Sequence, residues 1–149
     1  LHILDSLPKN IVSWLAFTVT AYNVNHMVDF MKWKLTESNF KRINGTKRRP
    51  IVTHHVAHHP KHLNVRVLPL AMKADITKRF EEFLIWVSEQ KFEKHVVDHA
   101  AEIVKGVTSY MNSDDYSEHW PEFVDYTKKL DKIRNQDIID IEPMFKDYI

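Results

Sequence analysis

An uncharged run near the start of the chain limits the folds that the sequence can adopt. Residues Trp14–Tyr22 (WLAFTVTAY) are aromatic, β-branched, small or aliphatic, and none of them carries a charge. Such a run is typical of a strand that is buried on both faces, as the strands of parallel sheets are. Asn23 or Asn25 then offers a helix N-cap, and apolar residues recur at helical spacing over Val24–Leu35. A strand that leads directly into an amphipathic helix opens a β-α-β unit, so we predict a mixed α/β fold.

The middle of the chain contains two further strand candidates. Ile51–Ala57 (IVTHHVA) and Leu63–Leu68 (LNVRVL) are both rich in β-forming residues. Pro60, between them, lacks the N–H that a ladder needs, so it belongs at a bend or an edge. The two runs either form a hairpin, or one is the sheet strand and the other its extension.

From Pro69 onward the sequence predicts helices, because apolar residues recur at intervals of three and four. The expected helices are Leu70–Phe92, Lys94–Met111, Glu122–Ile133 and a short one near Asp137–Phe145. The expected core residues are Phe17, Val19, Leu68, Phe80, Phe83, Leu84, Val104 and Leu130. We therefore expect one domain or fragment, with an α/β part over residues 1–69 and a helical part over residues 70–149.

Composition excludes several classes of function. The 149 residues include 21 basic and 20 acidic side chains, and this formal charge of +1 gives no general attraction to nucleic acid or membrane. There is no cysteine, so disulfides, thiolate catalysis and thiolate-held iron–sulfur clusters have no ligands in this chain. The longest nearly apolar stretch, Ile11–Ala21, is shorter than the roughly 20 residues of a membrane-spanning helix. We expect a cytoplasmic protein with no membrane partner, and we do not expect nucleic acid as its partner.

Histidine is the residue type that offers most chemistry here. Five of the ten histidines lie between His54 and His62, in the run HHVAHHPKH. Alternate residues of a strand share a face, so His54 and His58 are candidate metal ligands that would need a third ligand from elsewhere. No carboxylate lies within the run, and we predict no metal site. His55 faces the other side with Thr53 and is expected to line a pocket, unless all five histidines are rim residues.

A basic cluster surrounds the turn dipeptide Asn44-Gly45. Its members are Lys41, Arg42, Lys47, Arg48 and Arg49. Such a cluster in a loop is ordinarily a solvated surface, and it can also meet a phosphate or an acidic partner. The chain has only two glycines and no nucleophile-elbow motif, so no glycine-rich phosphate loop or hydrolase nucleophile accompanies the cluster.

Three segments together resemble a known family. Thr18–Phe30 contains a predicted strand that leads into Tyr22-Asn23. Pro60–Lys73 contains a segment rich in leucine and valine that begins at Pro60 and ends at Pro69. Phe123–Phe145 holds a tail with Leu130, Asp131, Arg134 and Asn135 ahead of a closing proline. These elements are similar to the carboxy-terminal half of radical S-adenosylmethionine proteins of marine phages and bacteria that carry a twitch-type domain. Asn135 stands where glycine is expected.

The resemblance implies a parent enzyme with a partial (β/α) barrel, in which a CxxxCxxC loop holds a [4Fe–4S] cluster that cleaves S-adenosylmethionine. This sequence departs from the family at that point, because it has no cysteine. It can supply two or three barrel strands, part of a substrate wall and the helices that close the barrel. We therefore expect a cluster-free carboxy-terminal fragment that is inactive alone and whose partner is the amino-terminal remainder of the parent.

Two functional interpretations follow. In the first, the fragment contributes to a substrate pocket through Tyr22, Asn23, His55 and Arg66. The chain opens with Leu1, and its first strand has no earlier strand to pair with, which favours a fragment whose open sheet edge promotes self-association. In the second, the chain is a free-standing interaction module that binds protein or nucleic acid through residues 41–49.

Overall fold

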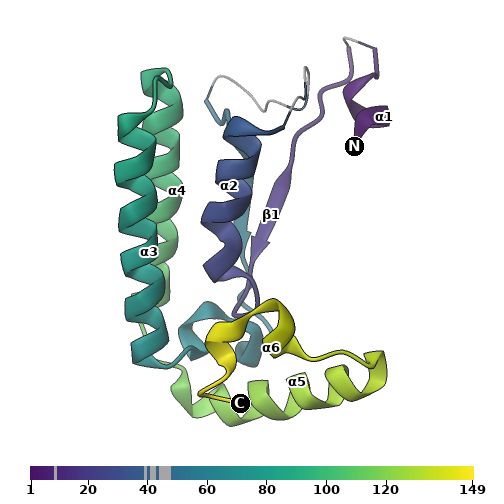
Figure 1. Cartoon of the computed structure of the whole chain (residues 1–149), viewed down its shortest axis with the longest axis vertical. Coiled ribbons are helices and arrows are strands. Elements are labelled where there is room, and N and C mark those ends of the chain that lie inside the picture. Colours follow the sequence, from purple (N-terminus) through teal and green to yellow (C-terminus); the bar gives the residue numbers. More distant parts are fainter. Residues whose placement is uncertain (9, 39, 41–42, 44–47) are drawn as a thin grey trace.

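The computed structural model describes residues 1–8, 10–38, 40, 43 and 48–149. The sheet consists of β1 (Ala16–Val19) and β2 (Thr53–Val56). The α-helices are α1 (His2–Asp5), α2 (Met27–Thr36), α3 (Leu70–Glu89), α4 (Lys94–Asn112), α5 (Trp120–Arg134) and α6 (Ile138–Ile141). Short 3-10 turns are η1 (Val24–His26), η2 (Lys61–Leu63), η3 (Val65–Val67), η4 (Ser117–His119) and η5 (Pro143–Phe145). The mixed α/β class is confirmed, and most of the ordered elements are helices (Figure 1).

The two strands are parallel, as the β-α-β pattern predicts. Ala16 pairs with Thr53 and Val19 pairs with Val56, and α2 lies in the connection between the strands. Parallel strands need a crossover because the chain must return to the same end of the sheet before it can pair again. The predicted strand at Trp14–Tyr22 and the predicted helix after it are thus confirmed in position, although each is shorter than its sequence pattern.

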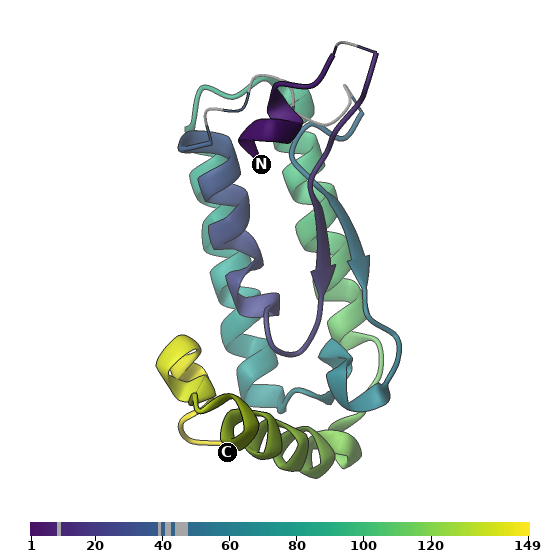
Figure 2. The same ribbon diagram turned by 90° about the vertical axis from the view of Figure 1, so that its right-hand side faces the viewer.

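In the part of the chain that the structure describes, helices cover one face of the sheet and leave the other uncovered. Phe17 and Val19 point toward the helices: the Phe17 ring lies 5.3 Å from that of Phe30 on α2, and Val19 is fully buried. Figure 2 shows both strands beside α2 and in front of α4, and none of the described helices lies in front of the strands. Ala16 and Thr18 alternate to that uncovered face and are exposed.

Long helices α3 and α4 lie side by side and supply much of the core (Figure 1). Their buried residues recur with helical spacing on both sides of the contact: Met72, Ile76, Phe80, Phe83 and Val87 from α3, and Ala100, Ile103, Val104, Val107 and Met111 from α4. Of the predicted core, Val19, Leu68, Phe80, Phe83 and Val104 are buried. Phe17, Leu84 and Leu130 are only half-buried, because each lies at the margin of its apolar stripe.

The predicted strand over Leu63–Leu68 is wrong, because this segment forms the 3-10 turns η2 and η3. The Asn64 side chain accepts a hydrogen bond from the backbone N–H of Arg66 at 3.0 Å, which closes a turn where a strand would need extended backbone. Val65 and Val67 are fully buried, so their β-branched side chains pack in the core although they lie in a turn. Pro60 precedes the turns at a bend, as predicted, and its peptide bond with His59 is cis.

The carboxy-terminal helices close one end of the molecule. Helix α5 lies across the end toward which β1 runs, with α6 folded back over it (Figure 1). Phe145 packs on Phe123 and Trp120, with ring centres 5.5 and 6.1 Å apart, and so attaches the last turn to α5. Pro143 interrupts the last helix as predicted. In the part of the chain that the structure describes, no helix is both long enough and apolar enough to span a membrane.

Candidate functional site

The uncovered face of the sheet presents a small set of polar groups. Ala16 and Thr18 of β1 stand beside Thr53 and His55 of β2, because the register pairs Ala16 with Thr53 and Thr18 with His55. We call these four residues the open face. Ala16, Thr18 and His55 are exposed and Thr53 is half-buried. Parallel sheets are covered on both faces in nearly all proteins, so the open face is the most unusual surface of the fold.

Just before β1, the chain exposes two large apolar side chains. Trp14 is 56% exposed and Val12 is 63% exposed, both far above what a core residue shows. Large apolar side chains that are exposed close together are less common on a protein surface than single ones. The open face itself carries hydroxyl and imidazole groups, and the segment that leads into β1 is apolar and exposed.

His54 lies on the opposite side of the sheet from His55, next to α4. The backbone N–H of Ile51 donates to Nδ1 of His99 at 3.4 Å, and His54 and His99 interact electrostatically with each other and with Glu102. Burial lowers the pKa of both imidazoles below the ordinary value, and the nearby Glu102 carboxylate opposes that shift. His99 is buried and His54 is half-buried, and the two imidazoles lie between β2 and α4.

The candidate metal pair has separate partners. Nδ1 of His58 lies 2.8 Å from the hydroxyl of Tyr110, and the two rings meet edge to face at 5.2 Å, whereas His54 lies toward His99. Among the described residues, no group of three or more histidine, aspartate or glutamate side chains could hold a metal ion.

Arg66 has a structural role in this fold. Its Nε donates to the carbonyl of Tyr110 at 3.1 Å, Nη2 donates to Ser113 at 2.6 Å, and Nη1 lies 2.9 Å from the Asp114 carboxylate. The guanidinium also stacks over the Tyr110 ring at 3.9 Å. These contacts attach η3 to the end of α4. The guanidinium forms its bonds within the protein. The structure does not place Arg66 with Tyr22, Asn23 or His55.

Tyr22 and Asn23 do come together, at the carboxyl end of β1. They line a cavity of about 450 Å³ with residues of η1, α5 and α6. Its lining is Tyr22, Asn23, His26, Thr127, Leu130, Asp131, Arg134, Gln136, Ile138 and Ile141, and we call it the strand-end cavity. The Asn23 side chain accepts from the N–H of Thr20 at 2.8 Å and donates to the carbonyl of Thr18 at 3.0 Å. Asn23 thus shapes the turn that carries Tyr22.

A buried carboxylate stands behind this cavity. Glu142 is only 2% exposed, and the Asn25 amide donates to both of its oxygens at 3.1 Å. Nε2 of His26 lies 2.8 Å from the same carboxylate, and Nδ1 lies 3.3 Å from Asp29, which also pairs with Arg79. Sequence reasoning did not identify this chain of charges, because no local pattern distinguishes Glu142 from the exposed acids around it.

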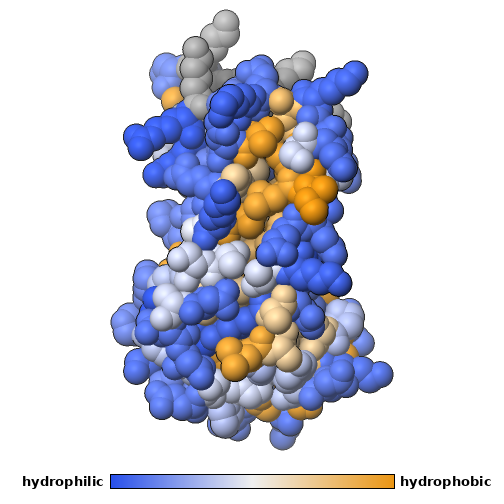
Figure 3. Space-filling view, turned by 90° about the vertical axis from the view of Figure 1, so that its left-hand side faces the viewer, coloured by the Kyte–Doolittle hydropathy of each residue, from blue (hydrophilic) through white to orange (hydrophobic). Residues whose placement is uncertain are grey.

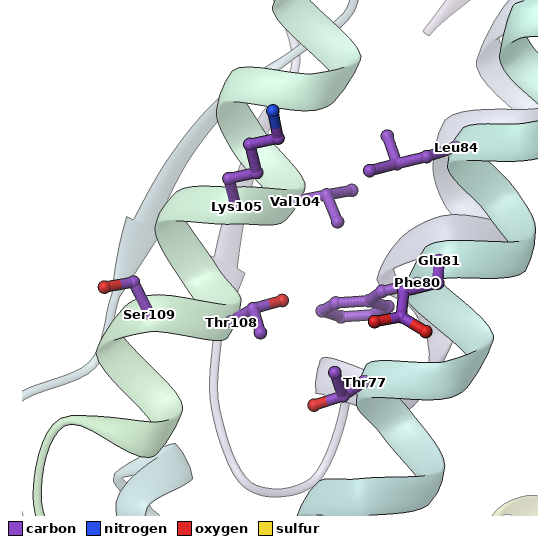
Figure 4. Close-up of a pocket in the computed structure, with 8 residues that line it drawn as sticks. All are labelled: Thr77, Phe80, Glu81, Leu84, Val104, Lys105, Thr108 and Ser109. Carbon is purple, nitrogen blue, oxygen red and sulfur yellow. The ribbon is translucent and has the colours of Figure 1, made fainter.

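A second hollow lies between α3 and α4. Figure 3 shows apolar surface on this side of the molecule, bordered by hydrophilic residues. The hollow measures about 340 Å³ and is lined by Thr77, Phe80, Glu81, Leu84, Val104, Lys105, Thr108 and Ser109. Phe80 and Val104 point toward each other across it (Figure 4). Nothing in its lining combines titratable groups in a way that suggests chemistry.

The basic cluster is described only in part. Arg48 and Arg49 are exposed, while Lys41, Arg42 and Lys47 lie outside the described residues. Comparisons of the chain with protein-family models, with curated proteins and with solved structures found no match.

Proposed function

We propose that this chain is the cluster-free, carboxy-terminal part of a radical S-adenosylmethionine enzyme, and that its open face forms part of the substrate wall. The observation that supports this most strongly is a two-stranded parallel sheet that, among the described residues, has helices on one face only. In a (β/α) barrel the helices form the outer ring, and the other side of each strand faces the interior. Thr18, Thr53 and His55 stand on that other side.

The chemistry of the open face suits a supporting role. Two threonine hydroxyls and an imidazole can each donate and accept hydrogen bonds, and so can orient a polar substrate. An imidazole can also accept or release a proton, so His55 can serve in proton transfer as well as in binding. The chain has no thiolate, so its residues do not fit an iron–sulfur cluster, and in this proposal the cluster and S-adenosylmethionine belong to the amino-terminal remainder of a cytoplasmic enzyme.

An interaction module that binds through residues 41–49 is the alternative. It rests on the composition of that segment, because only Arg48 and Arg49 of the basic residues lie in the described part. A near-neutral charge of +1 gives no wider electrostatic field to support binding of nucleic acid. We therefore rank this function second.

Amide hydrogen exchange tests whether the open face is covered in a complete enzyme. The 149-residue chain and the product of the whole open reading frame that contains it would be compared by mass spectrometry. Peptides that cover β1 should exchange at least about tenfold more slowly in the larger protein, because a new strand or segment protects their amides. Equal exchange in both proteins would contradict the proposal, and peptides of α3 serve as the internal control.

Self-association gives an independent readout of the same surface. An unpaired strand edge is a template for pairing with another chain, so the 149-residue chain should form larger species as its concentration rises. The larger protein should remain at one size over the same range. If the isolated chain stays monomeric and the exchange of β1 is unchanged in the larger protein, the sheet has no missing partner.

A further inference from the structure

The strand-end cavity is built entirely by this chain, and it has an apolar wall. Leu130, Ile138 and Ile141 line one side of it. Its volume of about 450 Å³ lies in the range of about 300–1,000 Å³ that is typical of small-molecule sites. Ile141 is 61% exposed, which marks the side that opens to solvent. The cavity is therefore large enough for a small ligand with an apolar part.

Two hydrogen-bond acceptors face a ligand in this cavity. The hydroxyl of Thr127 donates to the carbonyl of Phe123 at 2.7 Å, so the contact of 2.7 Å between Thr127 and Tyr22 must be donated by Tyr22. The Tyr22 oxygen thus keeps its lone pairs for a donor. Oδ2 of Asp131 accepts from the N–H of Ile138 at 3.1 Å, and its other oxygen makes no hydrogen bond within the described residues.

The cavity has one cation that can meet an anionic group. Arg134 is exposed and makes no hydrogen bond or ion pair among the described residues. His26, also in the lining, has Nε2 2.8 Å from the Glu142 carboxylate and Nδ1 3.3 Å from that of Asp29. Tyr22, Asp131 and Arg134 all line this cavity, so one small ligand can meet the hydroxyl oxygen, the carboxylate and the guanidinium together.

We propose that the strand-end cavity binds a zwitterionic α-amino acid with an apolar side chain. The ammonium group donates to Tyr22 and Asp131, the carboxylate pairs with Arg134, and the side chain packs on Leu130, Ile138 and Ile141. Charged hydrogen bonds of this kind are the stronger class in proteins, and an unpaired arginine can hold both oxygens of one carboxylate. This site does not depend on the enzyme proposed above, because every contributing residue belongs to this chain.

Titration calorimetry of the 149-residue chain with L-leucine tests the proposal. Leucine should bind, and two analogues should each bind at least about tenfold more weakly, because each lacks one charged group. The analogues are 4-methylpentanoate, which has no ammonium, and leucinamide, which has no carboxylate. Nitrogen-15 NMR should show the leucine-dependent shifts at Tyr22 and Ile138.

Substitutions identify the residues. Arg134→Gln should weaken leucine binding by at least about tenfold, whereas Lys132→Gln, an exposed neighbour on α5, should leave it unchanged. Tyr22→Phe keeps the ring and removes the acceptor, and should also weaken binding. If a variant fails to fold, the analogue series on the unaltered chain still decides. No binding at about 10 mM leucine, or equal binding of leucine and leucinamide, would overturn the proposal.

Discussion

His26 and Glu142 face each other across the cavity wall, with Nε2 of the imidazole 2.8 Å from a carboxylate that is only 2% exposed. This contact connects the start of α2 to the last residues of the chain. Asn25 donates to both oxygens of the same carboxylate, so two consecutive residues of η1 hold the carboxy-terminal segment in place.

Replacing the buried carboxylate tests that connection. Glu142→Gln keeps the shape but loses the charge and sets one amide against the Asn25 amide, so we expect a loss of about 1–3 kcal/mol in the free energy of unfolding. Urea denaturation followed by circular dichroism measures it. Glu82→Gln, on the exposed side of α3, is the matched control and should change the stability by less than about 0.5 kcal/mol. Equal stability of the two variants would show that the contact does not support the fold.

The α3–α4 core gives a second prediction. Phe83 is 1% exposed and its ring stacks on Trp86 at 5.8 Å, so Phe83→Ala should lower the free energy of unfolding by about 3–5 kcal/mol. Ile85, two residues later, is 59% exposed and lies on the opposite side of the helix. Ile85→Ala should therefore have little effect. A Phe83→Ala melting temperature close to that of Ile85→Ala would mean that the register of α3 differs.

Burial of His54 and His99 predicts how stability depends on pH. Burial lowers the pKa of both imidazoles, so the pKa of each in the folded chain lies below its value of 6.5 in the unfolded chain. Protons then bind more readily to the unfolded chain, and stability is fully present above about pH 6.5 and decreases as the pH falls below it. Protonation of His99 would also remove the acceptor for the Ile51 N–H.

Denaturation at a series of pH values between about 5 and 7.5 measures this dependence. His99→Gln retains an acceptor but does not titrate, so it should give a shallower decrease toward low pH. Ser109→Ala changes an exposed residue of the same helix that does not titrate, and it should keep the slope of the unaltered chain. An unchanged slope in His99→Gln would contradict the assignment to His99.

The end of α5 provides a backbone test. Asn135 adopts φ 50 and ψ 53, the left-handed conformation that ends a helix, and its N–H bonds to the carbonyl of Asp131. Asn135→Gly should be neutral or slightly stabilising, whereas Asn135→Ala should cost about 1 kcal/mol, because a Cβ is disfavoured there. Lys132→Ala, exposed on the same helix, is the control for thermal denaturation. An alanine variant as stable as the glycine variant would show that the left-handed turn is not required.

The same residue explains one feature of the resemblance. Glycine was expected at position 135, and asparagine is the other common residue in a left-handed C-cap. The departure from the expected pattern is therefore conservative in backbone terms. Glycine and asparagine can replace each other in this turn motif because both permit the left-handed backbone conformation.

Long-range periodicity made the helices predictable. Over Leu70–Glu89 and Lys94–Asn112 the apolar stripe repeats through many turns, so both helices were placed within about three residues of their ends. The predicted strand over Leu63–Leu68 is wrong for a local reason. Its residues are mostly β-forming, but the side chain of one asparagine in the segment closes a turn. In a short segment the pattern of apolar residues covers too few positions to predict the structure when one side-chain hydrogen bond favours a turn.

The candidate sites were predictable only in part. Strand alternation places His55 and Thr53 on one face, and the sheet register adds Thr18 to them. The strand-end cavity depends on Thr127, Asp131 and Arg134, which lie far from Tyr22 in the sequence and meet it only because α5 crosses the end of the sheet. No local sequence pattern predicts that α5 crosses the end of the sheet.

Reductive cleavage of S-adenosylmethionine tests the central proposal most directly. The product of the whole open reading frame that contains this chain would be reconstituted with iron and sulfide without oxygen, reduced, and assayed for 5′-deoxyadenosine. We predict cleavage by that protein, and none by the 149-residue chain, which has no thiolate for a cluster. An open reading frame without a CxxxCxxC motif, or a reconstituted protein that leaves S-adenosylmethionine intact, would contradict the account.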